Sequence, residues 1–165
     1  MKKVLIYSGI VIVLSAATAG LYWWTYFSFT PPNPEELVSK ALLAADMNEK
    51  ISATTALCAM KDPNPLPYLR DILGQSTDPE VVAQALSGMT VHLDHESIPL
   101  FIGYLDHASP AVRQAAYSGL LRLYGGELPD NIIYKPDAPA AERVKAANKL
   151  QKLYKEFKSR PLTKV

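Results

Sequence analysis

The chain has 165 residues, 48% of them hydrophobic and 20% charged, a composition that indicates a folded protein and excludes a disordered one. Its single cysteine excludes an internal disulfide, and its length leaves room for one modest domain after the first thirty residues rather than for two. The formal net charge of +1 conceals an acidic middle, with seven basic and fourteen acidic side chains in residues 31–138, and a basic end, with eight basic and two acidic ones in residues 139–165.

An uncharged apolar run occupies residues 4–29 and is long enough to cross the roughly 30 Å hydrocarbon layer of a membrane as a helix. The residues that would anchor this helix at the two interfaces are Lys2, Lys3, Trp23 and Trp24. The sequence therefore predicts a single-pass transmembrane anchor over residues 1–30, in contact with lipid through residues 4–29. The charge bias places the amino terminus in the cytoplasm and the remaining domain in the periplasm or outside the cell.

The alternative for this segment is a cleaved signal peptide, because a basic start, an apolar centre and the small residues Ala17, Thr18 and Ala19 have the required form. Cleavage after Ala19 would leave the apolar sequence GLYWWTYFSF exposed on a soluble protein, which favours the anchor. Both interpretations take the domain out of the cytoplasm and argue against nucleic acid as a partner. Residues 31–34 then form a stiff, proline-rich spacer.

The next part of the chain contains one helical pattern twice. DPEVVAQALSGMTV at residues 78–91 returns as SPAVRQAAYSGLLRL at residues 109–123, and LPYLRDIL at residues 66–73 aligns with IPLFIGYL at residues 98–105. Each unit thus holds two helices, and the period is near 31 residues. Such units are helical hairpins that bury their apolar faces against neighbouring hairpins.

Local signals mark where these helices begin, end and pack. Asp78 and Ser109 each precede a proline, so we expect their side chains to accept backbone N–H bonds at two helix starts. Gly125 and Gly126 follow the second copy and predict the end of its helix. Gly88 and Gly119 lie inside the helices and predict close approach of a facing helix. The predicted inward stripes are Val81, Ala85, Gly88 and Met89; Ile98, Phe101, Ile102 and Leu105; and Val112, Ala116, Gly119, Leu120 and Leu123.

A more degenerate unit precedes these two at residues 33–60, where Asn33 and Glu36 resemble a capping box. In its second helix, the inward spacing is reproduced by Ile51, Thr55, Cys58 and Ala59. With IPLFIGYLDHASP followed by VRQAAYSGLLRL, residues 35–125 resemble the HEAT-repeat family in its short bacterial form. The resemblance implies an α-solenoid of about three helical hairpins. It also implies that Arg113 ties neighbouring turns together, although Val82 replaces this arginine in the preceding unit.

After a loop at residues 126–137, residues 138–160 are predicted to form a basic helix capped by Asp137. Its apolar stripe consists of Val144, Ala147, Leu150, Leu153, Tyr154 and Phe157. Its lysines form either a solvated face on a helix that closes the repeat stack, the favoured interpretation, or a surface for an anionic partner.

A short cluster invites a metal hypothesis, since His92, Asp94, His95 and Glu96 fall within five residues. His107 would lie beyond the intervening helix, about 13 Å away, and does not complete the set. An ordinary helix turn with surface side chains is the favoured interpretation. Neither a nucleophile paired with a base nor a phosphate-binding glycine loop is evident, so no catalytic, cofactor or metal residue is assigned.

Together these patterns predict an all-α protein: one transmembrane helix, a small solenoid of about three HEAT-like hairpins and a C-terminal helix. We expect a non-enzymatic, membrane-anchored scaffold that binds partner proteins, as an accessory subunit of a larger membrane complex. The alternative is a secreted or anchored enzyme, or a metal-binding module using the cluster that begins at His92. The candidate partner-binding residues are His92, His95, Arg113, Tyr117, Arg122 and Tyr124.

Overall fold

All regular structure in the described part of the chain is helical. The computed structural model describes residues 33–62, 64–129 and 132–159, and from Pro34 onward they belong to one compact unit. The all-α prediction is thereby confirmed for these ranges. The predicted membrane segment, with Lys2, Lys3, Trp23 and Trp24, lies outside them. Within them, no helix combines the length and the apolar character needed to cross a membrane.

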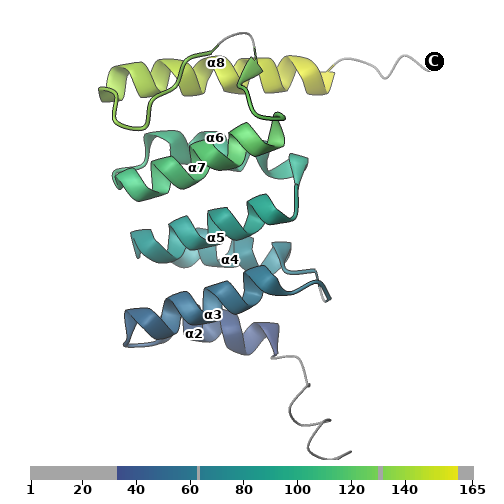
Figure 1. Cartoon of the computed structure of the whole chain (residues 1–165), viewed down its shortest axis with the longest axis vertical. Coiled ribbons are helices and arrows are strands. Elements are labelled where there is room, and N and C mark those ends of the chain that lie inside the picture. The colour runs from purple at the N-terminus through teal and green to yellow at the C-terminus, as the bar shows by residue number, and fades with distance from the viewer. Residues whose placement is uncertain (1–32, 63, 130–131, 160–165) are drawn as a thin grey trace, which may run out of the picture. The chain divides into compact units, whose positions relative to one another are not determined.

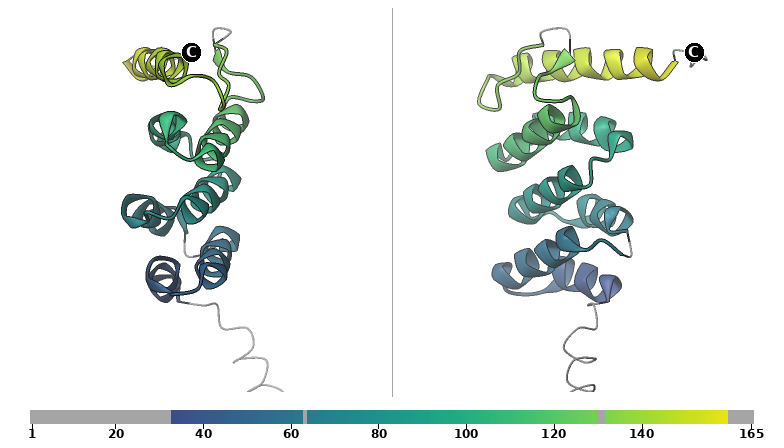
Figure 2. Two further views of the ribbon diagram at one scale, coloured as in Figure 1. Left: turned by 90° about the vertical axis from the view of Figure 1, so that its left-hand side faces the viewer. Right: turned by 45° about the vertical axis from the view of Figure 1, so that its right-hand side comes forward.

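The helices stand in successive pairs, layer upon layer (Figure 1). The pairs are α2 (Pro34–Leu43) with α3 (Met47–Ala59), α4 (Leu66–Gln75) with α5 (Pro79–Val91), and α6 (Ile98–Gly103) with α7 (Pro110–Leu123). Short 3₁₀ turns, η1 (His95–Ser97) and η2 (Tyr104–Asp106), flank α6, and the final helix is α8 (Ala140–Ser159). Seen after a turn of 90° about the vertical axis, the stack has α2, α4, α6 and α8 in one column and α3, α5 and α7 in the other (Figure 2, left).

Two helices of the second column begin and end where local sequence signals place them. Proline opens both α5 and α7, directly after Asp78 and Ser109. Neither of these cap side chains bonds to a backbone N–H, so that part of the prediction is wrong. The carboxylate of Asp78 instead accepts a hydrogen bond from the Lys50 ammonium at 2.6 Å, which ties α3 to the start of α5. Gly125 has a φ of +80°, a conformation that glycine adopts without strain, and α7 ends just before it.

The predicted apolar stripes of α5, α6 and α7 are all buried and form one continuous core. The predicted close approach at the two glycines is also confirmed. A Cβ atom at Gly88 would lie 2.8 Å from the Cβ of Cys58 in α3. One at Gly119 would lie 2.7 Å from a ring carbon of Phe101 and 2.8 Å from the Thr90 hydroxyl. Because Gly88 and Gly119 have no side chain, the neighbouring helices can approach them closely.

The prediction of which face of α3 points inward is wrong: the buried face is rotated by part of a turn from the predicted one. Thr55 and Ala59 are exposed, whereas Ala53, Thr54 and Leu57 are buried. The threonine that faces inward is Thr54 instead of the predicted Thr55, and its hydroxyl donates to the Lys50 carbonyl at 2.8 Å. This bond within the helix lets a threonine occupy a core position without an unsatisfied polar group.

Tyrosine side chains connect successive layers at equivalent places. The Tyr104 hydroxyl donates to the Leu73 carbonyl at 2.8 Å, and the Tyr134 hydroxyl donates to the Leu105 carbonyl at 2.5 Å. Leu73 and Leu105 are aligned positions of the two repeated segments. Tyr134 belongs to the loop after α7, so this loop takes up the contact that a further hairpin would have made.

The last helix begins two residues later than predicted. Pro139, rather than Asp137, precedes its first turn, and the Pro139 carbonyl accepts from the backbone N–H of Glu142 at 3.0 Å. The helix packs on α6 and η2, where Arg143 reaches Asp106 at 2.7 Å. Leu150 is fully buried there.

Candidate functional site

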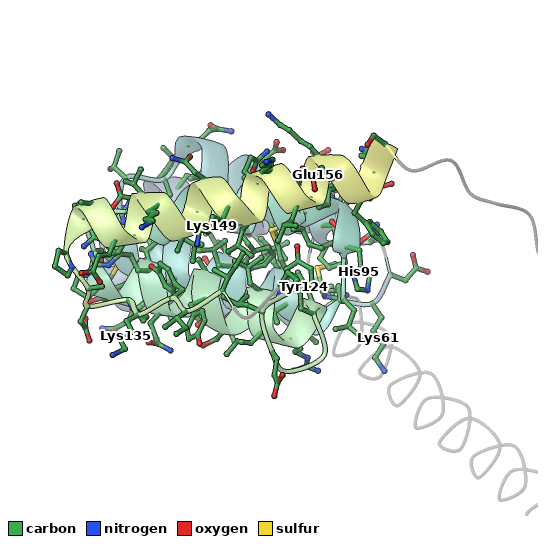
Figure 3. All side chains as sticks on the ribbon, turned by 90° about the horizontal axis from the view of Figure 1, so that it is seen from above. Lys61, His95, Tyr124, Lys135, Lys149 and Glu156 are labelled. Carbon is green, nitrogen blue, oxygen red and sulfur yellow. The ribbon has the colours of Figure 1, made fainter. Side chains whose placement is uncertain are left out.

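A groove opens under the second half of α8, at the end of the stack farthest from α2 (Figure 3). Its volume is about 610 Å³, and most of its lining is apolar or aromatic. The lining residues are His95, Ile98, Tyr124, Pro129, Leu153, Tyr154, Glu156 and Phe157. They come from η1, the start of α6, the end of α7 and the loop beyond it, and α8.

The groove exists because α8 is longer than the helix on which it packs. α8 has 20 residues, about 30 Å of helix, whereas α6 has 6 residues between two short 3₁₀ turns. Leu150, over α6, is fully buried. Phe157 falls on the same helix face two turns later and is 75% exposed. The apolar stripe of α8 thus continues past the layer that covers its middle.

A second hollow extends the groove along the flank of α8. It has a volume of about 230 Å³ and is lined by Ile132, Lys149, Lys152, Leu153 and Glu156. Leu153 and Glu156 line both hollows, so the two adjoin along the helix. We call the two hollows together the α8 groove.

The polar groups of the α8 groove are few and suit recognition. Burial, with Tyr154 nearby, raises the pKa of the Tyr124 hydroxyl, which stays protonated at neutral pH and can donate a hydrogen bond. Glu156 and Lys152 form an exposed ion pair at 3.8 Å, a contact of little energy. Apolar contact is therefore the main interaction that this site offers to a ligand.

Three of the sequence-predicted contact residues line hollows. His95 and Tyr124 meet in the α8 groove, although they lie 29 positions apart in the chain. Tyr117 lines a different hollow beside α7, where its ring lies 5.2 Å from that of Tyr134, centroid to centroid. The structure therefore brings two of the candidates together and leaves the third on another surface.

The remaining predicted contact residues have other roles or positions. Arg113 is only 7% exposed, and its guanidinium donates to the carbonyls of Ala108 at 2.8 Å and Pro136 at 2.6 Å. It is a structural residue that ties two turns together, as the family resemblance implied, and it is not available to a partner. A ring nitrogen of His92 lies 3.2 Å from the Cys58 carbonyl, between layers. Arg122 is exposed on α7 and does not line the α8 groove.

The cluster behind the metal hypothesis is divided among separate interactions. The Asp94 carboxylate accepts hydrogen bonds from Arg70 and Ser97, and His92 turns toward Cys58. Across the described ranges, no three or more His, Cys, Asp or Glu side chains come together in a way that could hold a metal ion. The local geometry thus gives the metal hypothesis no support.

Sequence reasoning did not predict that Leu153, Tyr154 and Phe157 line a hollow. It placed them on the apolar stripe of the last helix and favoured packing of that helix on the repeats, with docking on a partner as the alternative. A signal was present in the lengths, because the helix predicted over residues 138–160 is much longer than the eight-residue segment at 98–105. The contributions of Ile98 and Pro129 depend on the arrangement of the layers and have no local signal.

Comparisons with protein-family models, with curated proteins and with solved structures gave no match to this chain.

Proposed function

We propose that this chain is a non-enzymatic scaffold that holds partner proteins at a membrane, as an accessory subunit of a larger membrane complex. In this proposal the stacked pairs are a short α-solenoid of about three HEAT-like hairpins, closed on one side by α8. Residues 1–30 anchor the chain, and the described helical unit lies in the periplasm or outside the cell.

The observation that carries the proposal is the α8 groove. A largely apolar hollow of about 610 Å³, with an aromatic ring 75% exposed at its edge, presents surface that is stabilised when a ligand covers it. The polar groups around it form no constellation of nucleophile and base. Binding, rather than bond making, is the activity for which this surface is suited.

Two further features support a role as a scaffold. Stacked helical pairs offer extended surfaces that are held rigid by contacts between neighbours. The described unit begins at Pro34, the first residue of α2, whereas α8 and its groove lie at the opposite end of the stack (Figure 1). In this proposal the tether joins the unit at the end that does not carry the groove.

Purification from native membranes tests this proposal. The full chain, carrying an affinity tag and extracted in a mild detergent, is expected to elute with at least one other polypeptide at a fixed molar ratio that survives dilution. Quantitative mass spectrometry of the eluate, compared with that of an unrelated tagged membrane protein, measures this ratio. Elution of the 18.1 kDa chain alone, or with a mixture that matches the control, would contradict the proposal.

A further inference from the structure

The layer of helices that contains α8 is incomplete. In the three lower layers, each helix of the first column packs against a helix of the second: α2 with α3, α4 with α5, and α6 with α7. Above α7, the described chain has loop residues instead of a helix (Figure 2). One of them, Pro129, lines the α8 groove. We propose that an acidic amphipathic helix of a partner polypeptide lies in the α8 groove and completes this layer. This inference rests on the proposed function and specifies the kind of partner.

The shape of the groove fits a helix. The groove follows the flank of α8 from Lys149 to Phe157, a distance of about 12 Å along the helix axis. A helix that lies along such a groove can insert apolar side chains from two successive turns. The two hollows that meet at Leu153 would each receive one turn.

The apolar side chains of the groove supply the anchor for such a helix. Phe157 is 75% exposed, yet it continues the helix face on which Leu150 is fully buried. Leu153 and Tyr154 are half-buried between these two residues. Aromatic side chains, Phe among them, are enriched at the cores of protein interfaces.

Charge selects an acidic partner. The α8 sequence contains six basic and two acidic residues. Arg143 is already engaged with Asp106, and Glu156 forms only a long contact with Lys152. Lys149 and Lys152 line the extension of the groove and carry positive charge along the flank where the partner would lie. Acidic side chains at the edge of a partner helix would complement these lysines, whereas basic ones would be repelled.

Two synthetic probe peptides test the inference on the full chain, held in nanodiscs of zwitterionic phosphatidylcholine. Both peptides have about five helical turns and the same leucine stripe; the flanking residues are glutamate in one and lysine in the other. Fluorescence anisotropy measures their binding, with empty nanodiscs as the blank. We expect the acidic peptide to bind about tenfold or more tightly than the basic one, as complementary rather than opposed charges require.

Variants locate the binding. Phe157→Glu is expected to weaken binding of the acidic peptide about tenfold or more, because it removes an aromatic anchor and adds a negative charge beside the acidic peptide. Leu43→Glu is the matched control, because Leu43 is 79% exposed at the other end of the stack; it should leave binding unchanged. The double variant Lys149→Glu, Lys152→Glu should weaken the acidic peptide and strengthen the basic one, each by several-fold.

Several results would overturn the inference. Equal binding of the two peptides would show that charge does not select the partner. Equal effects of Phe157→Glu and Leu43→Glu would show that the peptide does not bind in the α8 groove. Loss of adsorption to phosphatidylserine vesicles in the double lysine variant, without any peptide binding, would identify lipid as the occupant. If a partner isolated from native membranes stays bound to the Phe157→Glu variant, the proposed function stands and this inference fails. If no partner is isolated, the proposed function fails, while the peptide preference still decides whether the groove accepts an acidic helix.

Discussion

Gly119 lies where α5, α6 and α7 meet, and replacing it with alanine tests how closely the layers are packed. The added Cβ would lie 2.7 Å from a ring carbon of Phe101 and 2.8 Å from the Thr90 hydroxyl. Neither neighbour can move away easily, because Phe101 is fully buried and Thr90 is only 8% exposed. Overpacking of this kind costs about 1–3 kcal/mol, and contacts under 3.0 Å with two buried neighbours place Gly119→Ala in the upper half of that range, at about 2–3 kcal/mol. Alanine gains about 1 kcal/mol of helix propensity over glycine, so we expect a net loss of about 1–2 kcal/mol.

Gly74 supplies the control, because it also lies in a helix and a Cβ at that position meets nothing within 4 Å. Gly74→Ala should therefore gain up to about 1 kcal/mol. Urea unfolding of the full chain, followed by circular dichroism at constant detergent concentration, measures both variants. With a slope of about 2 kcal/mol per molar urea, Gly119→Ala should unfold about 0.5–1 M earlier than the parent chain. A midpoint equal to or above that of the parent would refute the close packing of these three helices.

Three further predictions concern other parts of the described unit. Arg113→Ala should destabilise the fold by about 2–3 kcal/mol in the same urea assay, because buried backbone carbonyls lose charged donors; an unchanged midpoint would contradict this role. Burial raises the pKa of the Cys58 thiol to about 11, so its thiolate fraction at pH 8 is roughly 200-fold below that of a free cysteine. Its reaction with a disulfide reagent should be correspondingly slow and accelerate as the pH rises toward 11, whereas rapid labelling of the folded chain at pH 8 would show an accessible, ordinary thiol. Leu150→Ala should cost about 2–5 kcal/mol, whereas Phe157→Ala should leave stability nearly unchanged; equal losses would mean that the end of α8 is packed.

The helices of the repeated segments were predictable because each has local start and stop signals and its own stripe of apolar residues. Proline after Asp78 and after Ser109 marks two helix starts, and these prolines open α5 and α7. The glycines at positions 88 and 119 were interpretable before the structure, since glycine inside a helix is costly unless a neighbour needs the space. Local rules thus located the core of the second column.

The errors arise where a local rule competes with tertiary contacts. Asp78 has the sequence signature of a helix cap, but its carboxylate forms an ion pair with Lys50 from the preceding pair of helices. Thr55 was expected on the inward face of α3, but Thr54 is the threonine buried there, where its hydroxyl bonds to its own helix. The layer contact of Tyr134 could not be derived at all, because it depends on a loop passing over the Leu105 carbonyl.

The α8 groove was not predicted for a similar reason, because local sequence patterns do not specify tertiary contacts. Periodicity identified an apolar stripe ending at Phe157, but a stripe does not reveal where its covering layer ends. His95 and Tyr124 were predicted as contact residues without any indication that they would meet. Their meeting depends on the short α6 and on the position of α8, both of which are properties of the assembled stack.

Site-specific photocrosslinking tests the central claim most directly. A photoreactive phenylalanine analogue is placed in living cells at Phe157, and separately at Leu43, which is 79% exposed at the far end of the stack. Partner binding at the α8 groove predicts one adduct of defined mass from position 157, identified by mass spectrometry as a polypeptide with an acidic amphipathic helix, and no such adduct from position 43. The same adduct from both positions, or none from position 157, would contradict it.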